Sequence, residues 1–357
     1  MARTDTLEHF LTDVADAIRS KGGTQATIDA DNFDTAIGAL PSGGVAPNYV
    51  SFYNAPAGTD ISWLTDTSNL TSCNGMFMQA KTTGALDISS WDLSSCRDIT
   101  AIFNGSYFSS IKFPGGNIPA TDVMNVIDYT TNLTNFEFGS NCVFTELTSA
   151  RYMFKNYSTS ALTNLDFNGA SFPKLINFEG MFQGQSALTT LTLPTFGATN
   201  VTSLASMFNN CSSLVTINNL FPTAKTAASR ISLGDMFTYC RALTGVINLS
   251  TITATCSALS RAFNECGNVT EINLSNLSSI ANINMTNAFY KCTSLQKLDV
   301  RNMTMYSVTG TNIFGDESDS TTCVPNNCEI IVQDANSKSW FTSNYPRFTN
   351  VKTVAEL

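Results

Sequence analysis

Four cysteines recur at one position of a repeated pattern, and they are the residues best placed to do chemistry. They are Cys211, Cys240, Cys266 and Cys292, separated by 29, 26 and 26 residues. Stacked thiols could form disulfides or hold a metal ion, because the thiolate is both a nucleophile and a metal ligand. Other repeats place Ala80, Ser106, Tyr157 or Gln185 at this position, and no secretory signal is visible, so small, buried, reduced side chains are the better interpretation.

General acid–base chemistry has few candidates. His9 is the single histidine, and the sequence contains no Walker, nucleophile-elbow or His-Glu-x-x-His motif. Asp166, Glu271 and Asp299 fall at comparable repeat positions, which leaves a pair of glycosidase-like carboxylates open, although repeats align carboxylates by default. The acidic tract 315–320 could hold calcium, but a solvated loop is the better interpretation. We expect no enzyme, no catalytic residue, no metal ion and no cofactor.

The elements that would position these side chains follow from a recurring phenylalanine. It returns about every 26 residues, and one occurrence is missing near Val126 and Ile127. The recurring residues are Phe77, Phe103, Phe154, Phe182, Phe208, Phe237, Phe263, Phe289 and Phe314. A fixed period of this length is typical of a solenoid, in which each unit buries its apolar face against its neighbours. The sequence predicts about ten coils with parallel strands of the Leu-x-x-Leu-x-Leu kind, each preceded by a short helical turn at the Met-Phe position. A distorted coil is expected where the recurring phenylalanine is missing.

Composition fits a rod that recognises another surface. Hydrophobic residues make up 43% of the chain and charged residues only 13%, with a formal net charge of −9. The 19 basic residues are scattered, which disfavours nucleic acid, because phosphate binding requires clustered Lys and Arg. No apolar stretch approaches the length of about 20 residues that spans a bilayer, so membrane insertion is not expected.

The repeats are flanked by segments of different character. Residues 1–40 read as a small helical module, whose first helix carries apolar positions at helical spacing: Leu7, Phe10, Leu11, Val14 and Ile18. A linker at 41–48 and an N-terminal cap at 49–67 precede the solenoid at 68–319. Residues 320–357 form the closing cap, with a strand at Cys328–Val332, a short helix with Trp340 pointing inward, and a last extended segment.

Residues between the buried leucines of each strand should point outward in columns. These columns contain Asn135 and Glu137, Asn164 and Asp166, Thr190 and Thr192, Thr216 and Asn218, Glu271 and Asn273, and Lys297 and Asp299. They predict either a polar surface that binds a glycan or protein or an ordinary solvated strand face. No row of aromatic side chains occurs in these columns.

The motif Met-Phe-x-x-Cys-x-x-Leu-x-x-Leu-x-Leu, as at Met207-Phe208 to Ile217, resembles the BspA-like branch of leucine-rich repeat proteins. The resemblance covers about residues 68–314 and implies an α/β solenoid with parallel strands. That family includes bacterial surface adhesins, protist surface proteins and phage proteins, so it implies the fold more narrowly than the ligand.

The first residues resemble a module of phage structural proteins. The matching stretch is Leu11-Thr12-Asp13-Val14-Ala15-Asp16-Ala17-Ile18-Arg19, followed by Lys21-Gly22-Gly23-Thr24. It implies docking of residues 1–40 on other virion structural proteins of a tail fibre, baseplate or other appendage, and location in the virion. The solenoid would then bind a cell-surface glycan or protein of the bacterial host.

Alternatives remain open: a structural decoration or scaffold protein of head or tail, or a bacterial BspA-like adhesin. A homo-oligomer is also open, since phage appendages are often trimers, although no coiled-coil repeat is present.

Overall fold

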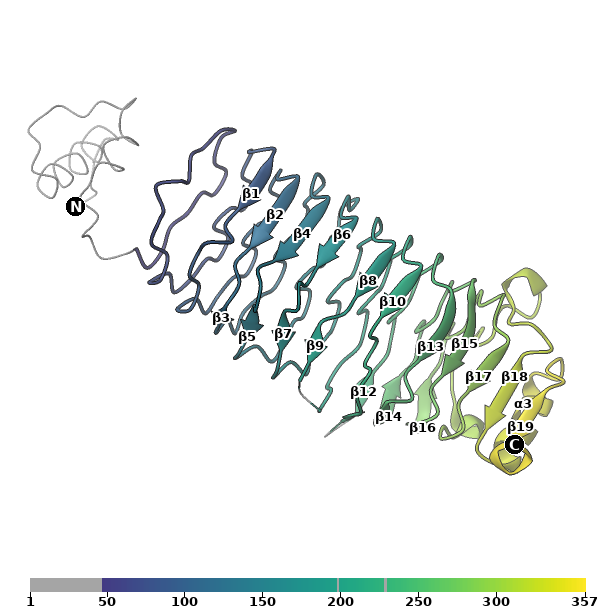
Figure 1. Ribbon diagram of the computed structural model, residues 1–357. Coiled ribbons are helices and arrows are strands. Elements are labelled where there is room, and N and C mark those ends of the chain that lie inside the picture. The colour runs from purple at the N-terminus through teal and green to yellow at the C-terminus, as the bar shows by residue number, and fades with distance from the viewer. Residues whose placement is uncertain (1–46, 198, 228–229) are drawn as a thin grey trace, which may run out of the picture.

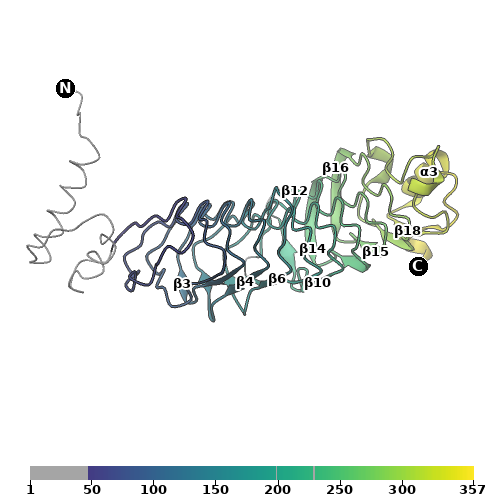
Figure 2. The same cartoon turned by 90° about the horizontal axis from the view of Figure 1, so that it is seen from above.

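The chain winds into a rod of stacked coils (Figure 1). The computed structural model describes residues 47–197, 199–227 and 230–357. A typical coil contains a strand, a second short strand and a compact turn built around one phenylalanine, and hydrogen bonds join neighbouring coils. Seen from above, the coils follow one axis to the C-terminal cap (Figure 2). The predicted solenoid with parallel strands is confirmed.

The first row of strands carries the Leu-x-Leu positions, and all its pairings are parallel. Its central side chains share one register, as in Leu86, Ile111, Phe136 and Leu165, and they are buried. We call the exposed side of this row the strand face. Its members are β1 (Ala85–Asp87), β2 (Ser110–Phe113), β4 (Asn135–Phe138), β6 (Asn164–Asp166), β8 (Thr190–Thr192), β10 (Thr216–Asn218), β13 (Gly245–Asn248), β15 (Val269–Asn273), β17 (Lys297–Asp299), β18 (Glu329–Val332) and β19 (Val351–Thr353).

This row is interrupted twice. The hydrogen-bonded groups are β1 to β6, then β8 with β10, then β13 to β19, so β6 does not pair with β8 and β10 does not pair with β13 in the described structure. A second row continues through both junctions, because β7 pairs with β9 and β11 pairs with β14. Its members are β3 (Asn117–Ile118), β5 (Val143–Phe144), β7 (Ser171–Phe172), β9 (Thr195–Phe196), β11 (Lys225–Thr226), β12 (Ile231–Ser232), β14 (Ile252–Ala258) and β16 (Leu277–Asn284).

The third side is formed by the phenylalanine turns, and we call it the turn face. Backbone N–H groups there alternate in direction: that of Phe77 donates to the carbonyl of Ile102 in the next coil (2.8 Å), and that of Met78 folds back to Gly75 (2.9 Å). In ten of the turns, from Phe77 onward, the residue two before the phenylalanine position has positive φ. These residues are Gly75, Ala101, Asn125, Tyr152, Gly180, Ser206, Asp235, Arg261, Asn287 and Asn312. The helical turn expected here is therefore wrong, because left-handed residues cannot continue a right-handed helix.

Phenylalanine rings form the spine of the rod. Rings from neighbouring coils stack with centroids 5.1 Å (Phe52 and Phe77) to 5.9 Å (Phe154 and Phe182) apart. Residues 47–357, apart from the gaps at 198 and 228–229, contain eleven such turns, one more than the sequence indicated, because Phe52 already forms one. The turns lie at Phe52, Phe77, Phe103, Ile127, Phe154, Phe182, Phe208, Phe237, Phe263, Phe289 and Phe314.

The coil without a spine phenylalanine is irregular. Ile127 occupies the place of the ring, and Phe136 from β4 bridges the gap edge-on to Phe103 (6.2 Å) and Phe154 (5.7 Å). The backbone of this coil is also displaced. In a regular coil the N–H of Ile127 would donate to the carbonyl of Met153, but here the N–H of Val126 donates to it instead. Rings from another element thus replace the missing phenylalanine of the spine.

The C-terminal cap contains the elements that the sequence predicts, with one difference. The helix α3 (Ala335–Asn344) covers the last coil, and β19 runs parallel to β18. Phe341 is the fully buried aromatic side chain of α3, whereas Trp340 is half-buried, so the expectation that Trp340 points inward is only partly met. Short 3-10 turns complete this end at Met305–Ser307, Ser320–Thr322 and Val354–Glu356.

Candidate functional site

The strand face presents most of the predicted columns to solvent. Six of these side chains are exposed, namely Asn164, Asp166, Thr190, Thr192, Thr216 and Asn218. Five are half-buried, namely Asn135, Glu137, Glu271, Asn273 and Lys297. The parallel register aligns them along the rod, so each position of the strand continues in the next coil.

Asp299 is the exception, because it is buried with 3% exposure instead of pointing into solvent. Arg301 lies over its carboxylate and donates from Nε at 2.9 Å. The hydrogen bond to Asp299 raises the pKa of Arg301. The prediction of an exposed Asp299 is therefore wrong, and this carboxylate holds the chain at the end of β17.

Side chains of successive coils hydrogen-bond to one another on the strand face. The amide of Asn164 donates to the Oδ1 of Asn135, and the amide of Asn135 donates to the hydroxyl of Ser110 (3.2 Å). Farther along, the amide of Asn218 donates to the hydroxyl of Thr192 (3.1 Å). These ladders hold polar groups in fixed positions, which reduces the entropy lost when a ligand binds them.

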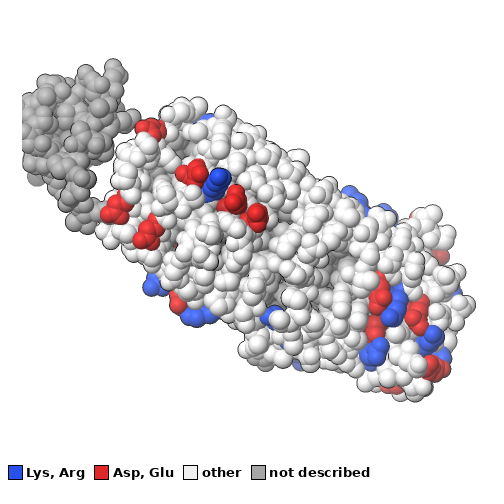
Figure 3. All heavy atoms as spheres, viewed as in Figure 1, with Lys and Arg blue, Asp and Glu red and all other residues white. Residues whose placement is uncertain are grey.

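Charge is concentrated toward the two ends of the strand face (Figure 3). Near the N-terminal end, Lys112 lies 4.0 Å from Asp87. Near the C-terminal end, Lys297 pairs with Glu271 (3.1 Å) and Lys352 pairs with Glu329 (2.6 Å). The middle, at β8 and β10, carries threonine and asparagine and has no charged side chain in its two outward columns.

A groove opens where β6 and β8 are unpaired. It has a volume of about 540 Å³ and is lined by Asn164 and Asp166 of β6, by Thr190 and Thr192 of β8, and by Asn219, which follows β10. Sequence patterning places these residues on one face but gives no sign that the sheet separates between them.

The three carboxylates that left a glycosidase open do not form an active site. Asp166 lies on β6, several coils away from Glu271 on β15. Glu271 is paired with Lys297, and Asp299 is covered by Arg301. In the described residues, no group of three or more His, Cys, Asp or Glu side chains is arranged to hold a metal ion.

The cysteine column is a row of buried thiols. Each Sγ points at the phenylalanine carbonyl of the preceding coil; that of Cys240 lies 3.1 Å from Phe208 O, and that of Cys292 lies 3.1 Å from Phe263 O. Burial raises the pKa of Cys211 to about 12 and raises that of Cys266 well above its ordinary value. The thiols therefore fill a tight corner of the core, as the small-residue interpretation predicts.

The turn face holds a buried ion pair that the repeat pattern does not predict. The Lys155 Nζ lies 3.4 Å from the Asp128 Oδ2, and the two side chains are only 5% and 2% exposed. The Asp128 Oδ1 accepts the backbone N–H of Tyr157 from the next coil at 2.8 Å and that of Tyr129 at 3.0 Å. The sequence does contain a signal, because Asp128 and Lys155, which carry opposite charges, directly follow the phenylalanine position in two successive repeats.

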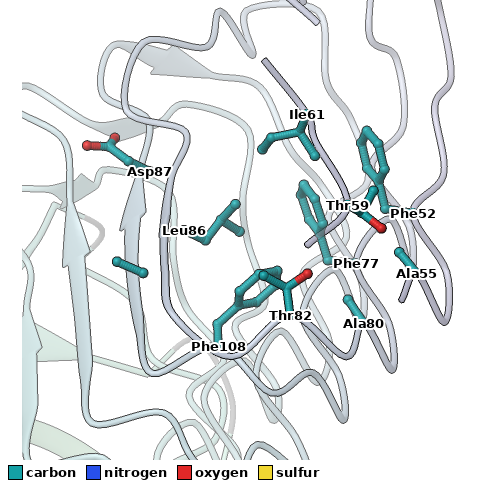
Figure 4. Close-up of a pocket in the computed structure, with 11 residues that line it drawn as sticks. Phe52, Ala55, Thr59, Ile61, Phe77, Ala80, Thr82, Leu86, Asp87 and Phe108 are labelled. Carbon is teal, nitrogen blue, oxygen red and sulfur yellow. The ribbon is translucent and has the colours of Figure 1, made fainter. Parts of the chain in front are cut away.

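An apolar cavity lies between the N-terminal cap and the first coils. It has a volume of about 180 Å³ and is lined by Phe52, Ile61, Phe77, Leu86 and Phe108, among others. Figure 4 shows the rings of Phe52 and Phe77 side by side, with Ile61 and Leu86 around the same space. Such a cavity is large enough for one apolar side chain and offers few polar groups to orient a ligand.

The predicted docking residues Leu7, Phe10, Leu11, Val14 and Ile18 lie outside the described residues, as does the whole module 1–40. Among the elements that are described, no helix is long and apolar enough to cross a membrane.

Comparisons with known proteins bear on the repeats. The family described as "Mycoplasma protein of unknown function, DUF285" matches residues 52–142 and 148–270, which supports the resemblance to BspA-like repeats; the N-terminal module lies outside this match. The crystal structure of a leucine rich cell surface protein from Faecalibacterium prausnitzii A2-165 aligns with 79% of this chain and 82% of that chain, at 15% identity and a TM-score of 0.23. Among curated proteins, none matches. The family match covers more than half of the residues of this chain, and the chain therefore belongs to the DUF285 family.

Proposed function

We propose that this chain is a recognition protein of the adhesion type, whose solenoid binds a component of a bacterial cell surface. The observation that carries the proposal is the strand face, where polar side chains are held in register by hydrogen bonds between coils. A solenoid presents such columns as an extended, fixed surface, which suits binding of a large or repetitive partner. The uncharged middle of the face at β8 and β10, beside the groove, is the proposed contact region.

The more specific form of the proposal is a phage virion protein attached through residues 1–40. It extends the resemblance of the first residues to a module of phage structural proteins, with Leu7, Phe10, Leu11, Val14 and Ile18 as the docking positions. A bacterial adhesin with the same repeats fits the described solenoid equally well.

Binding of the purified chain to a panel of bacterial cells tests the recognition role. We expect saturable binding that falls when Thr192→Lys and Asn218→Lys place charge in the uncharged region. Thr253→Lys is the matched control, because Thr253 is an exposed threonine on β14 in the second row. Failure to bind any cell would favour a decoration or scaffold role, in which the solenoid only packs against neighbours.

Deletion of residues 1–40 tests the attachment. If the module docks on a virion, the shortened chain should be absent from assembled particles. The purified solenoid should still bind cells. Normal incorporation of the shortened chain into particles would contradict the docking role.

A further inference from the structure

The repeat pattern is broken on the turn face between Phe103 and Phe182, around the buried pair of Asp128 and Lys155. Burying two charges is unfavourable unless their contacts compensate, and replacing such pairs by apolar residues is often neutral or stabilising. In other coils the corresponding positions next to the phenylalanine hold residues such as Asn104, Gln183 and Thr238, without an ion pair. Departures of this kind from a regular fold are expected where function requires them.

The break changes which side chain enters the core. Counting from Phe154 aligns Tyr157 with the buried cysteines, but Tyr157 is 64% exposed and Asn156 is buried in its coil instead. The amide of Asn156 donates to the carbonyl of Thr130 at 3.1 Å. The sequence alignment of Tyr157 with the cysteine column is therefore wrong, and the displaced coil projects this ring outward.

Two tyrosines of neighbouring coils consequently lie together on the surface. Tyr129 is 52% exposed, and its ring centroid lies 6.1 Å from that of Tyr157 at an interplanar angle of 45°. The Lys155 ammonium lies 3.5 Å from the Tyr157 ring centroid. The Asp128 carboxylate accepts the backbone N–H of both tyrosines. The buried pair thus fixes two exposed rings at a set distance and angle.

We propose that Tyr129 and Tyr157 form a sugar-binding platform on the turn face, a second contact in addition to the strand face, so that the surface component recognised by this protein is a glycan. An amphipathic tyrosine ring offers an apolar face to the C–H groups of a pyranose and a hydroxyl to its oxygens. The lysine beneath is neutralised by its aspartate, so the platform suits a neutral hexose better than a highly charged sugar. Two rings at a fixed angle would contact adjacent sugar units of a chain.

This inference names the ligand class for the proposed recognition function and rests on it. Its test uses the full chain and intact bacteria that the unmodified protein binds, before and after periodate oxidation of their surface sugars. We expect oxidation to abolish binding, and the double variant Tyr129→Ser, Tyr157→Ser to weaken it by at least about tenfold. The control is Tyr53→Ser, because Tyr53 is 54% exposed and its hydroxyl bonds Gln79 of the next coil.

A second variant keeps the test independent of folding. Tyr129→Phe with Tyr157→Phe retains both rings and should bind within about threefold of the unmodified chain, since stacking is kept and only the hydroxyls are lost. Circular dichroism and urea midpoints establish that each variant is folded.

The outcomes separate the inference from the function on which it rests. Cell binding that resists periodate, or that survives in the double serine variant, overturns the platform and leaves the recognition function standing. If no cell is bound, the recognition function fails, and calorimetry with dextran, mannan and galactan decides the platform alone. Saturable binding lost in the double serine variant would support it, and no binding to any of the three would overturn it.

Discussion

A phenylalanine inside the spine touches the rings of the coils before and after it. Phe263 lies 5.6 Å from both Phe237 and Phe289, and all three side chains are fully buried. Stacked aromatic pairs stabilise by about 0.5–1.5 kcal/mol beyond the area that they bury. Because each ring is shared between two junctions, the loss of one ring affects three coils.

Truncation of one spine ring should be strongly destabilising. We expect Phe263→Ala to lower the free energy of unfolding by about 3–5 kcal/mol, since it removes a buried ring and leaves a cavity. Urea denaturation followed by circular dichroism measures this change. Tyr306→Ala is the control, because Tyr306 is 51% exposed and should change the free energy by less than about 0.5 kcal/mol. Equal effects of the two substitutions would contradict a continuous spine.

Thiol reactivity should report the cysteine column directly. All ten cysteines are free, and nine of them are buried, so only Cys323 should react with a thiol reagent at neutral pH in the folded protein. Denaturant should release all ten. Burial raises the pKa of Cys142 and Cys211 to about 12, which keeps these thiols protonated as well as inaccessible. Loss of the native signal in Cys323→Ser would assign it, and rapid reaction of several thiols would rule out the buried column.

The elements that depart from the repeat depend on close backbone contacts. A Cβ on Gly184 would lie 2.0 Å from the carbonyl oxygen of Asn156, in the coil that projects Tyr157 outward. Gly169 also has positive φ, but a Cβ there would meet nothing within 4 Å. The two glycines therefore share a backbone conformation and differ in the space around them.

Substitution of these glycines separates the two effects. Gly169→Ala should lower the free energy of unfolding by on the order of 1–2 kcal/mol, the usual penalty for a left-handed residue with a Cβ. Gly184→Ala should lower it further, because the backbone of the neighbouring coil must also move. Urea midpoints of the two variants give the comparison. Equal losses would mean that the approach of Asn156 to Gly184 is not tight.

Much of the repeat could be predicted from sequence, because spine and strand depend on residue type. The interval between phenylalanines and the Leu-x-Leu spacing show directly which side chains should be buried, and the structure buries the side chains at these positions. The left-handed turns could not be predicted, because their positions hold residues as different as Gly180, Arg261 and Tyr152. Hydrogen bonds between coils impose that conformation.

The exposed columns of the candidate site could be predicted from sequence, but the positions of Asp299 and Tyr157 could not. The exposed columns follow from strand alternation, and most of them are where the pattern places them. Asp299 is buried because Arg301 lies over its carboxylate. Tyr157 is exposed because its backbone N–H bonds the Asp128 carboxylate and Asn156 takes the buried place, which a count from Phe154 cannot reveal.

At the scale of the whole molecule, the spine consists of two stacks. Phe52, Phe77 and Phe103 form the first, and the second runs from Phe154 to Phe314. The C-terminal cap closes the second stack, since Phe314 contacts Phe341 (5.4 Å) and Phe348 (5.3 Å). Terminal caps of this kind shield an apolar end that would otherwise meet water.

Removal of the C-terminal cap should therefore expose the spine. A chain that ends at residue 319 loses β18, β19 and α3, which uncovers Phe314 and the outer edge of β17. We expect increased fluorescence of a dye that binds apolar surface, and larger species in size-exclusion chromatography. Deletion of Leu357 alone, which is 61% exposed, is the control. An unchanged elution volume and dye signal would show that the cap is dispensable.

The separation of β6 from β8 has a mechanical consequence. If the rod is anchored at one end and holds a cell surface elsewhere, tension passes through its junctions in series. At this junction the backbone bonds of β7 with β9 and of the turn face bear the load without the β6–β8 ladder. The junction between β10 and β13 lacks this ladder as well, so stretching the molecule should rupture it first at one of these two junctions. Because β8 and β10 lie between them, tension would act on both sides of the proposed contact region.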